Sequence, residues 1–164
     1  MRVVITGSPG TGKTTIAKRL AKRLKGTWLN DRDFAVRKGI GHWDAEENEF
    51  VVPLTRLARE MNAELRKRKR AVAEGHLLCE ARLTADVVFV LRVHPELLEW
   101  RLERRGYRAE KVQDNVFCEG IDYCRKHALR RYGKNRVVEI DSGKGIKETM
   151  KRIVSELKAR GLLK

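Results

Sequence analysis

Cysteine is scarce in this chain, and its few copies are poorly placed for a scaffold. Cys79, Cys118 and Cys124 form an odd set without a CxxC pair. Such a set argues against a disulfide framework and against a zinc ribbon, and it favours a reducing compartment. Cys118, Cys124 and His127 could share one helix, but their spacing matches no usual metal site. We therefore expect no metal centre built on these side chains.

Long apolar runs are missing as well. No run approaches the roughly 18–20 apolar residues that a helix needs to cross a bilayer. The chain reaches a glycine-rich turn at Gly7, which leaves no room for the charged and apolar regions of a signal peptide. We expect a soluble, cytoplasmic protein without membrane contact. Because there is no internal repeat and no low-complexity linker, we expect residues 1–164 to form a single domain.

Aromatic residues make up only 6% of the chain, whereas apolar residues make up 41%. The core must therefore consist mainly of Val, Leu, Ile and Ala. Short apolar runs alternate with amphipathic segments, and this order predicts an α/β fold in which helices cover both faces of a parallel sheet. The expected strands are 3–6, 27–29, 71–73, 87–92 and 137–140.

The expected helices follow from apolar stripes and from proline and glycine. Pro95 is placed for the first turn of a helix that ends near Gly106. A longer helix is expected over 109–132, closed by Gly133. The segment 33–53 has weak periodicity, and we expect it to be loop or short helix over the site. Apolar stripes of helical spacing mark 16–24, 54–65 and 146–157 as further helices.

Glycine is concentrated where the first expected strand ends. Residues 7–14 read Gly-Ser-Pro-Gly-Thr-Gly-Lys-Thr and match the pattern GxxxxGK[ST] in full, directly after a strand and before a helix. Gly7, Gly10 and Gly12 let backbone N–H groups turn toward phosphate oxygens, where the dipole of the following helix adds to their field. The pattern predicts a P-loop that binds ATP.

Side chains around this loop supply the predicted chemistry. Lys13 is expected to reach the β- and γ-phosphates, the Thr14 hydroxyl to ligate Mg²⁺, and Thr15 to contact the α-phosphate. P-loop enzymes usually place an acid at the end of a neighbouring strand to orient magnesium-bound water, and Glu74 is the candidate. His76 is placed to take a proton from water or to orient it. The presence of His76 is therefore compatible with ATP hydrolysis, which benefits from a base. Transfer to a phosphate acceptor needs no base.

Arginines cluster near the end of one expected helix. Guanidinium groups on a closing segment can stabilise the charge of the transferred phosphoryl group while water is excluded. Arg104, Arg105 and Arg108 are best placed for this role. Arg130 and Arg131 are the alternatives, although a surface role explains them as well.

Positive charge is in large excess. The chain carries 37 Lys and Arg against 22 Asp and Glu, a formal net charge of +15. Nucleotide binding alone does not require this excess, which suits a protein that meets RNA or a ribosomal particle. A heat-adapted charged surface explains it equally well. The five cations from Arg66 to Arg70 have the same two explanations: a solvated helix end or a contact with the rRNA backbone.

Several segments of the chain occur together in one known family. They are 7–15, Glu74-Gly75-His76, 88–92, Arg101-Leu102-Glu103-Arg104-Arg105-Gly106-Tyr107, Asp114-Asn115 and Cys118-Glu119. Over nearly its whole length the chain resembles an archaeal-type member of the adenylate kinase isoenzyme 6 family, atypical small adenylate kinases that double as assembly factors of the small ribosomal subunit. The Arg-Gly-Tyr stretch with the last two pairs is the specific part, because a P-loop alone fits many families.

This resemblance implies a fold, a reaction and partners. The fold is an adenylate-kinase-like parallel sheet with strand order 2-3-1-4-5, an AMP-binding region within 30–53 and a short lid within 105–115. The reaction is ATP + AMP → 2 ADP with Mg²⁺, accompanied by some ATPase activity. The partners are a small-subunit ribosomal protein and the pre-ribosomal particle with its rRNA.

The resemblance also assigns roles to single residues. The acid and the histidine of the family's Asp-x-His motif, which act at the magnesium site, fall on Glu74 and His76, so the acid here lies one methylene further out. The lid arginine falls on Arg105, and a lysine near the adenine falls on Lys144. Where the family has Asp-Leu-Ala-Arg, this chain reads Asp-Phe-Ala-Val-Arg in 33–37, which displaces the arginine by one residue.

Three functions are therefore open from the sequence. The first is an adenylate kinase of nucleotide homeostasis. The second is an ATP-switched ribosome-assembly factor, in which slow ATP hydrolysis and not AMP phosphorylation is the biological activity. The third is a kinase for another nucleoside monophosphate or for a metabolite hydroxyl.

Overall fold

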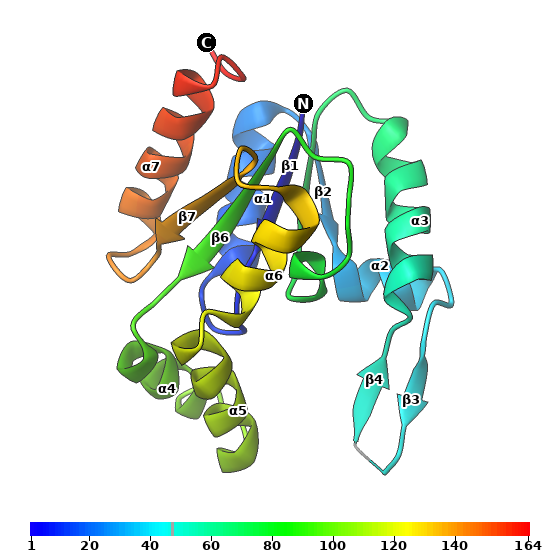
Figure 1. Ribbon diagram of the computed structural model, residues 1–164, viewed down its shortest axis with the longest axis vertical. Helices are drawn as coiled ribbons and strands as arrows, with labels where there is room; N and C mark the ends of the chain where they lie inside the picture. Colours follow the sequence, from blue (N-terminus) through cyan, green and yellow to red (C-terminus); the bar gives the residue numbers. More distant parts are fainter. Residues whose placement is uncertain (47) are drawn as a thin grey trace.

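The computed structural model describes residues 1–46 and 48–164, and its centre is a five-stranded parallel sheet (Figure 1). Residue 47, which falls within the expected AMP-binding region, lies outside the described residues. The strand order β2-β5-β1-β6-β7 confirms the predicted α/β fold and the predicted order, because β3 and β4 form a separate hairpin. The sheet strands are β1 (Arg2–Thr6), β2 (Thr27–Asn30), β5 (Ala71–Glu74), β6 (Val87–Arg92) and β7 (Val137–Asp141).

Helices cover both faces of this sheet, as predicted. On one face, α1 (Lys13–Leu24) and α7 (Ile146–Ala159) pack onto the sheet through their apolar stripes. On the other face, α3 (Leu54–Arg66) and α6 (Tyr123–Tyr132) do the same, together with the short 3₁₀ turn η1 (Leu77–Cys79). The central strands are buried on both sides, which explains their continuous runs of Val, Ile and Phe. No helix among the described residues is long and apolar enough to span a membrane.

The remaining elements gather at the carboxyl ends of the strands (Figure 1). Here lie α2 (Asp31–Arg37), the antiparallel hairpin of β3 (His42–Asp44) and β4 (Glu49–Val51), and the pair α4 (Pro95–Glu103) and α5 (Ala109–Gly120). The expected loop or short helix over 33–53 is thus part of α2 followed by a hairpin that the sequence did not reveal. Its strands are three residues long, too short to show the alternation that identifies a strand.

The expected long helix over 109–132 is wrong, because the chain breaks it into α5 and α6. The break lies at Asp122, whose φ of 60° places it in the left-handed region. An aspartate tolerates this conformation better than most residues. The Asp122 carboxylate also accepts a 2.7 Å contact from the guanidinium of Arg92 at the end of β6. A long-range ion pair therefore accompanies the break, and apolar periodicity does not report it.

Candidate functional site

A cavity of 420 Å³ opens at the carboxyl edge of the sheet, where β1 passes into α1. The elements that line it are the P-loop, the start of α2, the end of β5 and the loop between α4 and α5. The structure brings these predicted site residues to its wall: Gly10, Gly12, Lys13, Thr14, Thr15, Glu74, His76 and Arg105. Of the site residues predicted from the sequence, only Lys144 is absent from this wall.

The P-loop is shaped by contacts that converge on one carbonyl. The Ser8 carbonyl oxygen accepts hydrogen bonds from the Thr11 hydroxyl at 2.9 Å and from the Lys13 ammonium at 2.8 Å. Gly12 precedes α1 with a φ of 90°, a conformation that a residue with a side chain adopts only under strain. The amino end of α1 thus opens into the cavity, and its free N–H groups and dipole favour an anion there.

A second set of contacts joins the P-loop to side chains from later segments of the chain. The fully buried Glu119 of α5 accepts a 2.6 Å hydrogen bond from the Ser8 hydroxyl and a 2.5 Å ion pair from Arg92. The Ser142 hydroxyl donates to the Thr11 carbonyl at 2.8 Å, and Arg101 donates to the Gly10 carbonyl. Glu119 had no role in the sequence reasoning beyond its place in the family pattern. The structure shows that it ties the P-loop to the helices that follow β6.

Lys13 is almost buried, with 9% of its surface exposed. Burial lowers the pKa of its ammonium, while the charges of Cys124, Glu74 and Asp31 act in the opposite direction. The side chain therefore sits in a partly desolvated site where a second anion would stabilise its charge. A triphosphate in the cavity would supply that anion.

Glu74 ends β5 inside the cavity and is 1% exposed. Its Oε1 accepts a 2.8 Å hydrogen bond from Nδ2 of Asn30. Oδ1 of Asn30 in turn accepts from the backbone N–H of Asp33 and thereby caps the start of α2. The Asn30 side chain therefore links Glu74, the acid predicted to act at the Mg²⁺ site, to α2, the helix at the start of the expected AMP-binding region.

Asp31 is a second carboxylate in this cavity, and sequence reasoning missed it. The side chain is 5% exposed and accepts backbone hydrogen bonds from Arg32 at 2.7 Å and from Leu77 at 3.0 Å. Gly75 permits this position, because a Cβ there would lie 1.9 Å from Cγ of Asp31. Burial raises the pKa of Asp31 to about 6, although the two backbone hydrogen bonds act against it. An acid two residues after the second expected strand was the available signal.

This raised pKa predicts a pH-dependent stability that Asp31→Asn should remove. Between pH 3.8 and about 6 the folded chain keeps a proton that the unfolded chain releases, so the free energy of unfolding falls as pH rises through this window. The variant lacks this loss. Its stability relative to the parent should increase by about 2 kcal/mol from pH 4 to pH 7 in urea titrations. An unchanged difference across that range would contradict the assignment.

His76 faces the cavity with its ring held from the protein side. Nδ1 lies 3.3 Å from the Gly7 carbonyl oxygen and 3.6 Å from Sγ of Cys124. Burial alone would lower the pKa of His76, but the hydrogen bond and charge of Cys124, with the Gly7 carbonyl, outweigh it and raise the pKa. A hydrogen bond from Cys79 and the contact with His76 lower the pKa of the Cys124 thiol. Because Nδ1 is engaged, Nε2 is the nitrogen left for a ligand.

The predicted arginines divide between the cavity and the surface. Arg105 lines the cavity and also an adjoining hollow of 220 Å³ between the P-loop, Arg101 and the start of α7. Arg104 instead lies over the ring of Trp100, 4.8 Å from its centroid. Arg108 is exposed at the start of α5. Of these three arginines, Arg105 is therefore the one that lines the cavity, together with Lys13 and Arg32.

Lys144, expected near an adenine, is exposed in the turn between β7 and α7. It does not line the 220 Å³ hollow, but its neighbour Gly145 does. The hollow is also bordered by Ile146 and Thr149, so it offers apolar and hydroxyl surface beside the P-loop. Lys144 thus lies at the edge of the hollow and not in its wall.

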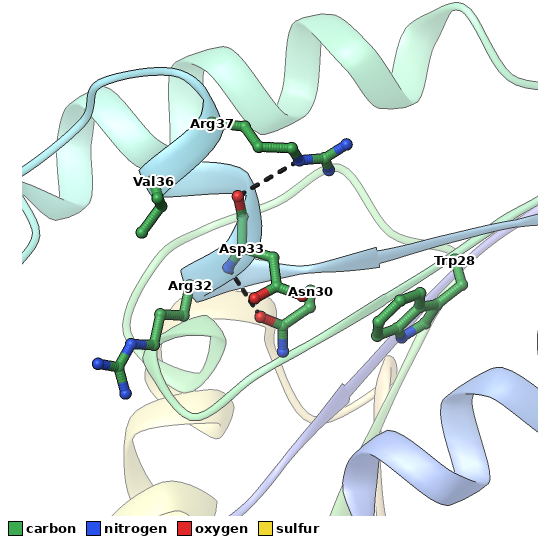
Figure 2. A pocket seen from close by; sticks show the side chains of 6 residues that line it. All are labelled: Trp28, Asn30, Arg32, Asp33, Val36 and Arg37. Carbon is green, nitrogen blue, oxygen red and sulfur yellow. Dashed lines mark hydrogen bonds between the residues drawn. The ribbon is translucent and has the colours of Figure 1, made fainter.

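A larger hollow of 480 Å³ adjoins the cavity on the α2 side (Figure 2). Trp28 of β2 forms one wall, and α2 forms the other. Figure 2 shows Arg37 bonded back to its own helix, through Nε to the Asp33 carbonyl at 3.3 Å. Asn30 and Arg32 line both this hollow and the P-loop cavity. Two compartments therefore meet at Asn30 and Arg32.

The donors in the cavity fit Mg²⁺ better than a transition metal. The carboxylates of Glu74 and Asp31 and the exposed hydroxyl of Thr14 are oxygen ligands of the hard type that Mg²⁺ prefers. No group of three or more His, Cys, Asp or Glu able to hold a metal is found among residues 1–46 and 48–164. Cys118, Cys124 and His127, spread over α5 and α6, form no such group.

Comparisons with known proteins agree with this geometry. The family model AAA_18, described as an AAA domain, matches residues 3–122. A protein of Thermococcus kodakarensis named "Putative adenylate kinase" is 40% identical over 156 residues, which cover 94% of this chain and 84% of that protein. A protein of the same name from Methanocaldococcus jannaschii is 34% identical over 161 residues, which cover 96% of this chain and 86% of that protein.

Solved structures share the fold at low sequence identity. Deoxyadenosine kinase from M. mycoides with bound dATP superposes with a TM-score of 0.63 at 15% identity, over 96% of this chain and all of that one. Shikimate kinase from Aquifex aeolicus gives a TM-score of 0.63 at 16% identity, over 99% of both chains. At these identities the likenesses show the fold alone, which this chain shares with both of these proteins.

Proposed function

The chain belongs to the archaeal adenylate kinase family that these relatives represent, and on that premise we propose that it transfers the γ-phosphoryl group of ATP to AMP and yields two ADP. The observation that carries this proposal is the pair of compartments that meet at Asn30 and Arg32. One compartment has a P-loop, and the other is large enough for a second nucleotide. Phosphoryl transfer needs both reactants held in line within van der Waals reach.

Each wall of the α2-side hollow offers a feature that suits a nucleoside monophosphate. Trp28 presents a half-buried indole to a base, and the Asp33 carboxylate can accept a hydrogen bond from an exocyclic amino group. The exposed guanidinium of Arg32 stands at the junction, where an acceptor phosphate would lie. We assign to Arg32 the acceptor contact that the displaced Arg37 does not make.

The residues of the P-loop cavity then have distinct roles. The backbone N–H groups of Gly10 and Gly12 hold phosphate oxygens, and Lys13 and Arg105 balance the charge that builds on the β–γ bridging oxygen as the acceptor oxygen of AMP gives up its own. Glu74 and Thr14 would hold Mg²⁺, which screens the phosphates when bound. The phosphorus–oxygen bond to ADP breaks as the bond to AMP forms. The acceptor oxygen is already ionised at pH 7, so no base is required.

ATP hydrolysis is the second candidate activity, and the placement of His76 favours it. His76 lines the cavity while its Nδ1 lies 3.3 Å from the Gly7 carbonyl oxygen, which leaves Nε2 to position a water. In that case the biological output is an ATP-switched release of a small-subunit ribosomal protein from the chain during assembly of the particle. The net charge of +15 suits work beside rRNA.

An acceptor panel with phosphate release measured in the same tubes separates these activities. We expect AMP to be phosphorylated with kcat/KM at least about tenfold above other nucleoside monophosphates and hydroxyl acceptors, because one pocket reads one base. Chromatography of labelled nucleotides reports the transfer. Phosphate release with no phosphorylated AMP would overturn the adenylate kinase proposal. Stronger capture of a small-subunit protein with ATP than with ADP would then support the assembly role.

A further inference from the structure

A basic concave surface lies at the end of the sheet opposite the P-loop. The sheet strands are all parallel, so their starts share one edge, which in Figure 1 is the end that carries both chain termini. There the turn between α1 and β2 meets the turn between α3 and β5 around a hollow of 400 Å³. Gly26 and Thr27 form its floor. The other lining residues, which with these two we call the basic groove, are Lys25, Lys67, Arg68, Lys69 and Arg70.

Five of the seven lining residues of the basic groove are cations, and all five are exposed. Glu64 pairs with two of these cations, with Lys67 at 3.2 Å and with Arg68 at 2.6 Å. Among the described residues, Lys25, Lys69 and Arg70 have no ion pair with a carboxylate. By contrast, exposed cations on α7 alternate with Glu148 and Glu156. The groove is therefore a site of uncompensated positive charge.

Long-range contacts hold these cations together. The Thr27 N–H donates to the Arg70 carbonyl at 3.0 Å, and the amino-terminal ammonium donates to the Lys69 carbonyl at 2.7 Å. The guanidinium of Arg70 donates to the Leu24 carbonyl at 3.1 Å. A Cβ at Gly26 would lie 2.9 Å from the Arg70 carbonyl oxygen, so the two turns touch. The fold thus brings like charges together against their repulsion, and a polyanion would relieve that repulsion.

A second hollow of 310 Å³ extends the groove along the edge strand β2. It shares Thr27 and Arg68 with the basic groove, includes the Glu64 carboxylate that pairs with Arg68, and adds the cations Arg37 and Lys38 beside the ring of Trp28. A row of cations next to an aromatic ring is the arrangement that binds a single nucleic-acid strand, because phosphates meet the cations and a base stacks on the ring. None of the exposed large apolar side chains among the described residues lines either hollow, which disfavours a membrane surface.

We propose that the basic groove binds the phosphodiester backbone of a single nucleic-acid strand, which continues along β2 toward Trp28. This inference goes beyond the proposed kinase activity and does not rest on it. The basic groove lies at the opposite edge of the sheet from the P-loop cavity, so the strand and ATP can be held together, whereas a base of the strand on Trp28 would compete with the AMP base for that ring. It also gives a role to residues 67–70 of the cation run, which the catalytic site does not use.

The test is fluorescence anisotropy with labelled oligouridylate, oligothymidylate and a duplex of equal length, without ATP. The groove variant Lys25→Gln/Lys67→Gln/Lys69→Gln is compared with Lys151→Gln/Arg152→Gln/Lys158→Gln, which removes the same charge from the exposed face of α7. We expect the groove variant to bind single strands at least about tenfold more weakly at about 100 mM salt. Its slope of log K against log salt should be shallower by about 2, or about 0.7 for each lost contact. The α7 variant should change affinity less than about twofold.

Three outcomes would overturn the proposal. Equal losses in both variants would show that net charge alone attracts the strand. A clear preference for the duplex, or binding to phosphatidylserine vesicles that the groove variant loses while single strands bind as before, would assign the groove to another polyanion. AMP phosphorylation and thermal melting of both variants check folding, and the single Lys69→Gln variant repeats the comparison if the triple variant fails to fold.

Discussion

Lys13→Met should abolish phosphoryl transfer from ATP while leaving the fold intact. We expect kcat to fall by on the order of 10³-fold, because a desolvated cation aimed at the transferred group acts far more strongly than one in water. Methionine retains the unbranched chain in the buried space but cannot donate to the Ser8 carbonyl or to a phosphate. Burial lowers the pKa of Lys13, which means that the charged ammonium destabilises the folded chain. In the absence of nucleotide, the variant should therefore melt at a temperature no lower than that of the parent.

The matched control is Lys22→Met on the exposed face of the same helix. Initial rates of ADP formation with ATP, Mg²⁺ and AMP compare the two variants with the parent, and titration calorimetry compares their binding of Mg·ATP. The control should retain the parent rate. If Lys13→Met turned over within about threefold of the parent, the triphosphate would have to bind elsewhere than at this loop.

The parts of the fold that the sequence predicts are those encoded over short distances. Buried parallel strands read as runs of Val, Ile and Ala with helical stripes between them, and the P-loop is a contiguous motif. All five predicted strands lie within β1, β2, β5, β6 and β7. Their order was implied by a resemblance, because no periodicity reports which strand pairs with which.

The features that the sequence did not reveal depend on contacts between distant segments. Asp31 is an ordinary acid in the sequence, and it becomes a buried group only because Gly75 brings β5 against it. Glu119 anchors the P-loop only because α5 ends beside β6. The break at Asp122 likewise accompanies an ion pair with Arg92. Packing of this kind places the residues around a motif, whereas the motif itself is local.

Glu74→Gln should weaken Mg²⁺ binding, so that the half-saturating Mg²⁺ concentration rises by about 10–100-fold and kcat/KM falls by a similar factor. The amide keeps an oxygen for Nδ2 of Asn30, so the start of α2 should stay in place while the negative charge is lost. The Mg²⁺ dependence of ADP formation measures the effect. Mn²⁺ binding followed by electron paramagnetic resonance reports the same loss without turnover.

Two further variants distinguish a specific role of Glu74 from a general need for negative charge in the cavity. Glu74→Asp keeps the charge and shortens the side chain by one methylene, so it should retain Mg²⁺ binding better than Glu74→Gln. Asp31→Asn removes the other carboxylate of the cavity, and it separates a local requirement for Glu74 from a general need for negative charge. If all three variants bound Mn²⁺ as the parent does, neither acid would serve the cation. The buried, hydrogen-bonded Glu74 would then act only by holding Asn30 and the start of α2, a role that a carboxylate and an amide fill equally well.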